Sequence, residues 1–201
     1  PQMRIVHTEA GISKKPLPSS YSLATRERVE DPKHSGIKDP HIWLSPPLVR
    51  VQARNMGRAL QQFDPSHQEA YQENLSAFLG RVNELHADLQ AMLTPVQGKP
   101  FLVFHPAWGY FARTYGLRQV AVELEGKDPK PSQLARLISF ARAEGIRAIF
   151  VQPQFSAKSA RMVAREIGAE VIVADPLAQD WWGQMRGQAQ ALRRVIGDDA
   201  R

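Results

Sequence analysis

The segment RAIFVQPQFSAKSARMVAREIGAEVIVADPL, residues 147–177, decides the fold. Two short runs, RAIFVQ and AEVIVA, are rich in apolar and β-branched side chains, as expected of buried strands. The run between them, SAKSARMVAREIG, has a helical pattern and ends on a glycine. Two strands that are joined by a helix run parallel in one sheet. The segment therefore predicts a βαβ unit.

The same alternation covers residues 98–201. The runs PFLVFH and RQVAVEL are further predicted strands, and AWGYFARTYG, SQLARLISFARAEG and WWGQMRGQAQALRRVIG are predicted helices. Repeated alternation of this kind predicts an α/β lobe, with a mainly parallel sheet and helices on both faces. In such sheets ligands bind outside the carboxyl ends of the strands.

Two longer helical patterns precede this lobe. The first, residues 45–63, begins with Ser45 at a plausible N-cap and has apolar side chains near helical spacing, including Met56, Leu60 and Phe63. After Asp64-Pro65 a second pattern runs for about 28 residues, or about 40 Å. We interpret this second helix as a strut between two lobes. Residues 1–40 have a strand-like MRIVHT followed by a long surface loop rich in Pro, Ser, Lys and Asp.

Composition excludes several classes of protein. The chain has 201 residues and a formal net charge of +6. No apolar run approaches the roughly 20 residues of a membrane-spanning helix. Lys and Arg are mixed with acidic residues, without a dense basic run among aromatics, so we expect no nucleic-acid binding. Cysteine is absent, which excludes disulfides and thiolate metal sites. No signal-peptide pattern opens the sequence, so the protein is either cytoplasmic or a processed or trimmed chain.

Three residues are candidate metal ligands. His105 and Asp175 follow two predicted strands at the expected ligand-binding edge, and His41 lies where a loop becomes a helix. Two imidazoles and a carboxylate suit zinc, manganese or ferrous iron. Structural roles are the alternatives: His41 as a cap or a partner of Trp43, His105 as a hydrogen-bonded strand end, and Asp175 as a turn or N-cap residue.

The other histidines have weaker patterns. His67 and His86 lie among polar neighbours in helical register and are expected to be solvated, and His7 is expected to be structural. His34, in the surface loop, is at most a weak metal contact.

Catalytic motifs are scarce. The sequence contains no Gly-x-Ser-x-Gly elbow, HExxH motif or phosphate-binding loop. Glu123 and Glu125 end a predicted strand, and either is a possible base beside a metal, although surface or loop-ordering roles are favoured.

Five motifs together resemble one family. DPHIWLSP, FLVFHPAWGYFARTYGL, EGKDPKPSQL, AIFVQPQFSAKSA and VIVADPL have the order and approximate separation of motifs in the periplasmic metal-binding proteins of zinc and manganese ABC transporters. The chain resembles this family, the cluster A-I solute-binding proteins, from about Ile5 to its end. The resemblance implies that His41, His105 and Asp175 are metal ligands. His at position 105 favours zinc, because manganese-selective relatives tend to carry Glu there.

The resemblance also implies a fold and a function. It implies two α/β lobes joined by a long helix, with residues 1–64 as the remainder of an N-terminal lobe, 65–97 as the linking helix and 98–201 as the C-terminal lobe. The implied protein is not an enzyme. It captures Zn²⁺, or alternatively Mn²⁺, and delivers it to an ABC permease. We expect a monomer that is periplasmic or otherwise extracytoplasmic, either free or membrane-anchored, with its signal segment outside this chain.

The chain departs from the family in three places. The family has another histidine ligand early in its N-terminal lobe that no segment here matches, so a fourth ligand is expected upstream. The His-rich loop of zinc relatives is represented only by His34. Pro106 and Trp108 replace a common Asp and a smaller aromatic, so contacts behind the ligands are expected to differ. Two alternative functions are a metal-dependent hydrolase with Glu125 as base, and an adhesion or interaction module of the same fold.

Overall fold

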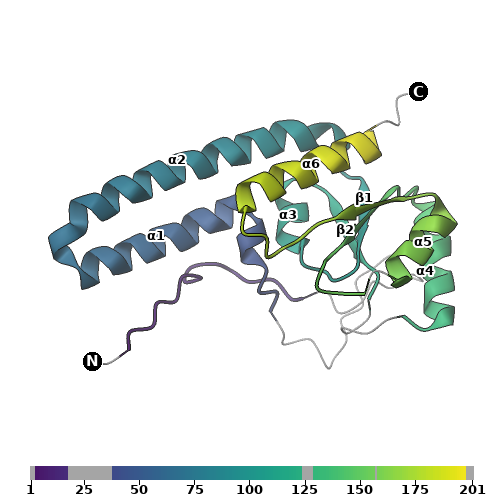
Figure 1. Ribbon diagram of the computed structural model, residues 1–201, viewed down its shortest axis with the longest axis horizontal. Helices are drawn as coiled ribbons and strands as arrows, with labels where there is room; N and C mark the ends of the chain where they lie inside the picture. Colours follow the sequence, from purple (N-terminus) through teal and green to yellow (C-terminus); the bar gives the residue numbers. More distant parts are fainter. Residues whose placement is uncertain (1–2, 18–37, 124–128, 157, 198–201) are drawn as a thin grey trace.

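A helical hairpin extends from a compact α/β unit in the computed structural model (Figure 1). The structure describes residues 3–17, 38–123, 129–156 and 158–197. Its helices and strands, in chain order, are α1 (Pro46–Phe63), α2 (Gln68–Leu93), β1 (Pro100–Val103), α3 (Gly109–Thr114), β2 (Arg118–Ala121), α4 (Pro131–Ala143), β3 (Ala148–Val151), α5 (Lys158–Ile167), β4 (Glu170–Val173) and α6 (Trp181–Gly197). Short 3-10 turns are formed by Ile42–Leu44, Pro65–His67 and Thr94–Val96.

The four strands form one parallel sheet in the order β2-β1-β3-β4. The central strands β1 and β3 are buried at every position, as expected of a parallel sheet that is covered on both faces. Leu102, Ile149 and Val151 pack into the core beneath α4 and α5. Phe101 and Phe150 point the other way, into the core formed with α2, α3 and α6. The predicted α/β lobe and its parallel sheet are confirmed.

The α1–α2 hairpin is less fully covered than the sheet. The second half of α2 buries Leu85, Leu89 and Leu93 in the core shared with α6. On α1, however, Met56 is 51% exposed, and Leu60 and Phe63 are also exposed. The apolar spacing predicted the helix correctly, but the described residues do not bury this part of it.

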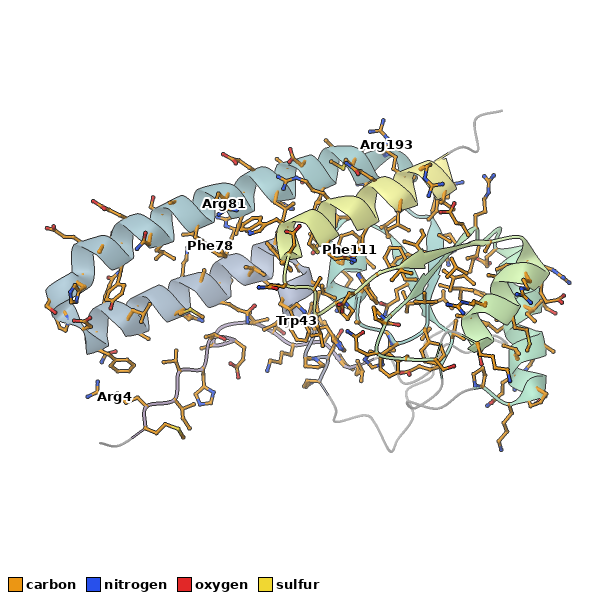
Figure 2. The ribbon with its side chains drawn as sticks, in the orientation of Figure 1. Arg4, Trp43, Phe78, Arg81, Phe111 and Arg193 are labelled. Atoms are coloured by element: carbon orange, nitrogen blue, oxygen red, sulfur yellow. The ribbon has the colours of Figure 1, made fainter. Side chains whose placement is uncertain are left out.

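An apolar groove of about 750 Å³ lies between α1, α2 and the beginning of α6. Trp182 lines this groove, with its ring edge-on to Phe78 and beneath the Arg81 guanidinium. Phe78 and Arg81 both belong to α2 (Figure 2). The long helix α2 runs from the hairpin turn to the α/β unit (Figure 1). The division into residues 1–64, 65–97 and 98–201 stays a prediction.

The N-terminal segment differs from its prediction. Residues 3–7, expected to be strand-like, form no strand with any described residue, and only an isolated bridge joins Pro16 to Lys38. Asn55 of α1 donates hydrogen bonds to the carbonyls of Thr8 and Ala10, which holds this segment against the hairpin. Most of the predicted surface loop, residues 18–37, lies outside the described residues.

Candidate metal centre

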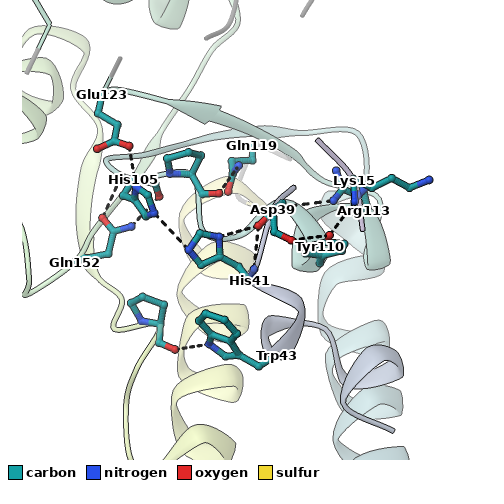
Figure 3. Close-up of polar contacts among 12 residues, drawn as sticks. Lys15, Asp39, His41, Trp43, His105, Tyr110, Arg113, Gln119, Glu123 and Gln152 are labelled. Atoms are coloured by element: carbon teal, nitrogen blue, oxygen red, sulfur yellow. Dashed lines mark hydrogen bonds and ion pairs between the residues drawn. The ribbon is translucent and has the colours of Figure 1, made fainter. Parts of the chain in front are cut away.

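Two imidazole rings face each other where the hairpin meets the sheet. Nε2 of His41 lies 3.4 Å from Nε2 of His105, and the rings are inclined at 72° (Figure 3). His41 comes from the loop that leads into α1, and His105 follows β1. Two candidate ligands 64 residues apart in the sequence are therefore brought together.

His41 is fixed by the carboxylate of Asp39. Oδ1 of Asp39 accepts hydrogen bonds from the backbone N–H of His41, at 3.0 Å, and from ring atom Nδ1, at 2.7 Å. Immediately after His41 the chain forms the turn Ile42–Leu44, with Ile42 and Leu44 buried. This turn fixes the backbone at His41, while Asp39 fixes the orientation of the His41 ring.

Asp39 is itself fully buried and held from α3. Tyr110 donates from its hydroxyl to the Asp39 carbonyl at 3.0 Å and accepts from the N–H of Lys15 at 2.9 Å. Burial raises the pKa of Tyr110, which keeps its hydroxyl a donor. Nη2 of Arg113 lies 4.0 Å from Oδ2 of Asp39, which has no hydrogen-bond partner among the described residues. The guanidinium offsets part of the cost of burying this charge.

His105 has a matching carboxylate. Its Nδ1 lies 2.7 Å from Oε1 of Glu123, a residue that is only 5% exposed. Val103 pairs with Ala121 in the β1–β2 register, so His105 and Glu123 stand two residues beyond paired positions. Parallel register thus places the imidazole and the carboxylate side by side at the ligand-binding edge.

The loop after β3 holds His105 from a third side. Gln152 accepts from the backbone N–H of His105 at 3.2 Å and donates to its carbonyl at 2.7 Å. The ring of Phe155 stacks on the imidazole with centroids 5.2 Å apart. Backbone and ring of His105 are therefore both restrained.

These contacts define which nitrogen of each ring is free for a metal. Ionised carboxylates only accept hydrogen bonds, so Nδ1 of both histidines donates, and in the neutral rings each Nε2 then presents a lone pair. A tetrahedral zinc ion bound at about 2.0–2.1 Å separates two ligand nitrogens by about 3.4 Å. The two Nε2 atoms have this separation, and a carboxylate behind a ligating histidine is the usual arrangement in metal sites.

Asp175 is not part of this pair in the structure. It follows β4, and its Oδ1 accepts from Nε2 of Gln154 at 2.7 Å and from the N–H of Leu177 at 2.9 Å. Within the ranges that the structure describes, no group of three or more His, Asp or Glu side chains is arranged to hold one metal ion. Trp43, which follows His41, donates from its indole to the carbonyl of Pro176 at 2.8 Å, so the two loops are in contact.

The remaining histidines lie elsewhere. His67 is exposed, as predicted, and bonds to Asp64 in the hairpin turn, while His7 is exposed beside Glu9. The prediction of a solvated His86 is wrong: it is half-buried on α2, contacts the Tyr115 hydroxyl at 3.2 Å, and burial lowers its pKa. His34 and the proposed base Glu125 lie outside the described residues.

Sequence reasoning missed the roles of Asp39 and Glu123. A signal existed for each: Asp39 stands two residues before His41, and Glu123 ends the strand after the one that His105 ends. Recognising Glu123 required the strand order and register, which show that β1 and β2 are neighbours.

Residues 2–195 match the family model of ZnuA, described as zinc-uptake complex component A, periplasmic. The chain belongs to this zinc-uptake family. Membership in the component A family confirms the resemblance drawn from the five motifs.

Relatives and a solved structure agree with this assignment. Zinc-binding protein AdcA of Streptococcus pyogenes serotype M1 is 30% identical over 172 residues, which are 80% of this chain and 33% of AdcA. High-affinity zinc uptake system protein ZnuA of Bacillus subtilis (strain 168) is 32% identical over 141 residues, 69% of this chain and 44% of that protein. A crystal structure of ZnuA superimposes with a TM-score of 0.84 at 36% identity, covering 96% of this chain and 70% of that one. The chain thus spans a third to less than half of these curated relatives.

Proposed function

We propose that this chain is the metal-holding part of a zinc-uptake solute-binding protein, in which His41 and His105 bind Zn²⁺ through their Nε2 atoms. The observation that carries the proposal is the 3.4 Å separation of these atoms, with each Nδ1 held by a buried carboxylate. Such a pair is preorganised: both rings already have the tautomer and orientation that a metal needs.

Zinc is the favoured cargo and Mn²⁺ the alternative. Imidazole nitrogen suits zinc, whereas Mn²⁺ is better served by carboxylate and carbonyl oxygen. The relatives AdcA and ZnuA are named for zinc binding and zinc uptake. Asp39 and Glu123 add two negative charges behind the rings, which favours a divalent cation between them.

Asp175 is proposed as a third ligand, and a further one is expected from the part of the family's N-terminal lobe that this chain does not match. The contact between Trp43 and Pro176 brings the loop of Asp175 beside that of His41. Few ligands gathered from separate loops favour binding that can be reversed, as a carrier requires.

The proposed place of action is outside the cytoplasmic membrane, with an ABC permease as the receiving partner. The family description names a periplasmic component of a zinc-uptake complex. None of the described helices is both long and apolar enough to span a bilayer. A monomeric state and attachment by a lipid anchor belong to the same proposal.

Zinc binding by point variants tests the proposal. His41→Ala and His105→Ala are each expected to weaken zinc binding at least about tenfold, measured by competition with a chromophoric chelator. His67→Ala is the matched control, because His67 is exposed in the hairpin turn and bonds only within that turn. Wild-type affinity in both site variants would remove the basis for the proposal.

The two alternatives gain no support from the site. The hydrolase needs a base beside the metal, but Glu123 is occupied by His105 and Glu125 lies outside the described residues. The adhesion module rests on no contact or surface at this site.

A further inference from the structure

The loop between β3 and α5 contacts both candidate ligands of the α/β unit. Gln152 holds the backbone of His105, and Phe155 stacks on its ring. Gln154, between them, donates from Nε2 to Oδ1 of Asp175 at 2.7 Å. One short loop therefore restrains both His105, which already faces His41, and Asp175, which lies apart from the histidine pair.

The two contacts of Asp175 differ in kind. The bond from the N–H of Leu177 joins residues two positions apart, and it is the common hydrogen bond of an Asp side chain in a turn. The bond from Gln154 joins residues 21 positions apart, on different loops. It is charge-assisted and short, so Asp175 must give it up or reorient it before its carboxylate can turn toward the histidine pair.

We propose that Gln154 is a positioning residue that holds Asp175 away from the histidine pair, so that it competes with zinc for this carboxylate. This inference rests on the proposed function. A residue that merely oriented a ligand would hold it within the site. Gln154 instead holds Asp175 in an arrangement where it shares no metal-sized group with His41 and His105 among the described residues.

The surroundings allow the contact to open. Gln154 is exposed to solvent, so its amide can exchange Asp175 for water at little cost. A cavity of about 660 Å³ lies between this loop and α5, bordered by Gln152, Phe155, Arg161 and Met162. The loop therefore borders free volume, while Gln152 remains hydrogen-bonded to the backbone of His105.

Gln154→Met tests the competition, because methionine has nearly the same length but no donor. Zinc affinity is expected to rise about threefold to tenfold, the scale of one typical net hydrogen bond in water. Gln154→Lys restores a donor to Asp175, so affinity is expected to return to the wild-type level or below. Gln61→Met is the matched control: its Nε2 also donates to a side chain, that of Gln72, at the far end of the hairpin.

A double-mutant cycle shows whether the effect passes through Asp175. In an Asp175→Ala background, Gln154→Met is expected to leave zinc affinity unchanged. The visible absorption of the Co²⁺-loaded proteins is a second readout. It is expected to be the same for Gln154→Met as for wild type, since the final ligand set is unaltered, and to change for Asp175→Ala.

Three outcomes would overturn the inference: weaker zinc binding by Gln154→Met, unchanged binding, or the same gain in the Asp175→Ala background. If Asp175→Ala itself binds zinc like wild type, Asp175 is not a ligand and the inference also fails. None of these results would contradict zinc binding by the histidine pair. That proposal is contradicted only if His41→Ala and His105→Ala both keep wild-type zinc affinity.

Discussion

Nε2 of His41 and Nε2 of His105 lie 3.4 Å apart, each on a ring whose other nitrogen is 2.7 Å from a buried carboxylate. Two lone pairs that face each other at this distance repel unless a proton or a metal cation lies between them. The buried carboxylates oppose turning of either ring, because turning would cost a buried carboxylate one of its hydrogen bonds. The fold thus holds an arrangement that a divalent cation would relieve.

The carboxylate behind His41 gives the first prediction. Asp39→Asn keeps the shape and an acceptor oxygen for the ring but removes the negative charge. Zinc affinity is expected to fall about tenfold or more, as is usual when a supporting carboxylate is changed. Chelator competition measures the fall, and Glu123→Gln is expected to behave alike on the other ring. A wild-type affinity in both variants would show that the carboxylates are only structural.

Gly109 gives a steric prediction. A Cβ at this position would lie 3.0 Å from Oδ2 of Asp39. Gly109→Ala is therefore expected to displace Asp39, lower the free energy of unfolding by about 1–3 kcal/mol and weaken zinc binding severalfold. Gly80→Ala in α2 is the control, because a Cβ there meets nothing within 4 Å. Urea unfolding and zinc titration of the two variants check this. Equal behaviour of the two would contradict the close approach of α3 to Asp39.

Trp43 gives a prediction about the contact between the two loops. Trp43→Phe keeps an aromatic ring beside His41 but removes the indole donor to the buried Pro176 carbonyl. Leaving that carbonyl without its partner is expected to cost about 1–2 kcal/mol of unfolding free energy. Urea denaturation measures this cost. No loss of stability would mean that water replaces the indole and that the two loops are not joined through this bond.

Asp64, in the turn between α1 and α2, gives a prediction on pH. Hydrogen bonds from Ser66, then Tyr71 and His67, lower the pKa of Asp64 to about 2. Its folded pKa lies below its ordinary value, so its stabilising effect is complete above that value and is lost as pH falls through about 2.

Asp64→Asn is accordingly expected to lower the thermal midpoint slightly at pH 7, by about 1–2 °C because the site is exposed. The difference from wild type is expected to vanish near pH 2. Thermal unfolding followed by circular dichroism at pH 7, 4 and 2 compares them. A difference that persists unchanged at pH 2 would rule out the ionised carboxylate as its source.

Local patterns predicted the helices, the strands and the parallel sheet because each pattern is a property of contiguous residues. The ends of β1 and β4 placed His105 and Asp175 at the ligand-binding edge for the same reason. The approach of His41 to His105 depends on a contact between distant segments, and the family resemblance implied it. The short turn of Ile42–Leu44 was not predicted.

Other features required the folded chain. The role of Glu123 depends on register between β1 and β2, which no single segment encodes. The half-buried state of His86 follows from its contact with Tyr115, 29 residues away. The bond between Gln154 and Asp175 joins the loops that follow β3 and β4. It could be predicted only once the pairing of these two strands was known.

X-ray absorption at the zinc edge, on the 1:1 zinc complex of the chain, tests the central claim most directly. The account predicts a first shell with at least two imidazole nitrogens at about 2.0–2.1 Å, completed by oxygen or further nitrogen. In His105→Ala the imidazole contribution is expected to fall by one. A first shell without imidazole, or one that is unchanged in both His41→Ala and His105→Ala, would contradict the claim that this histidine pair holds the metal.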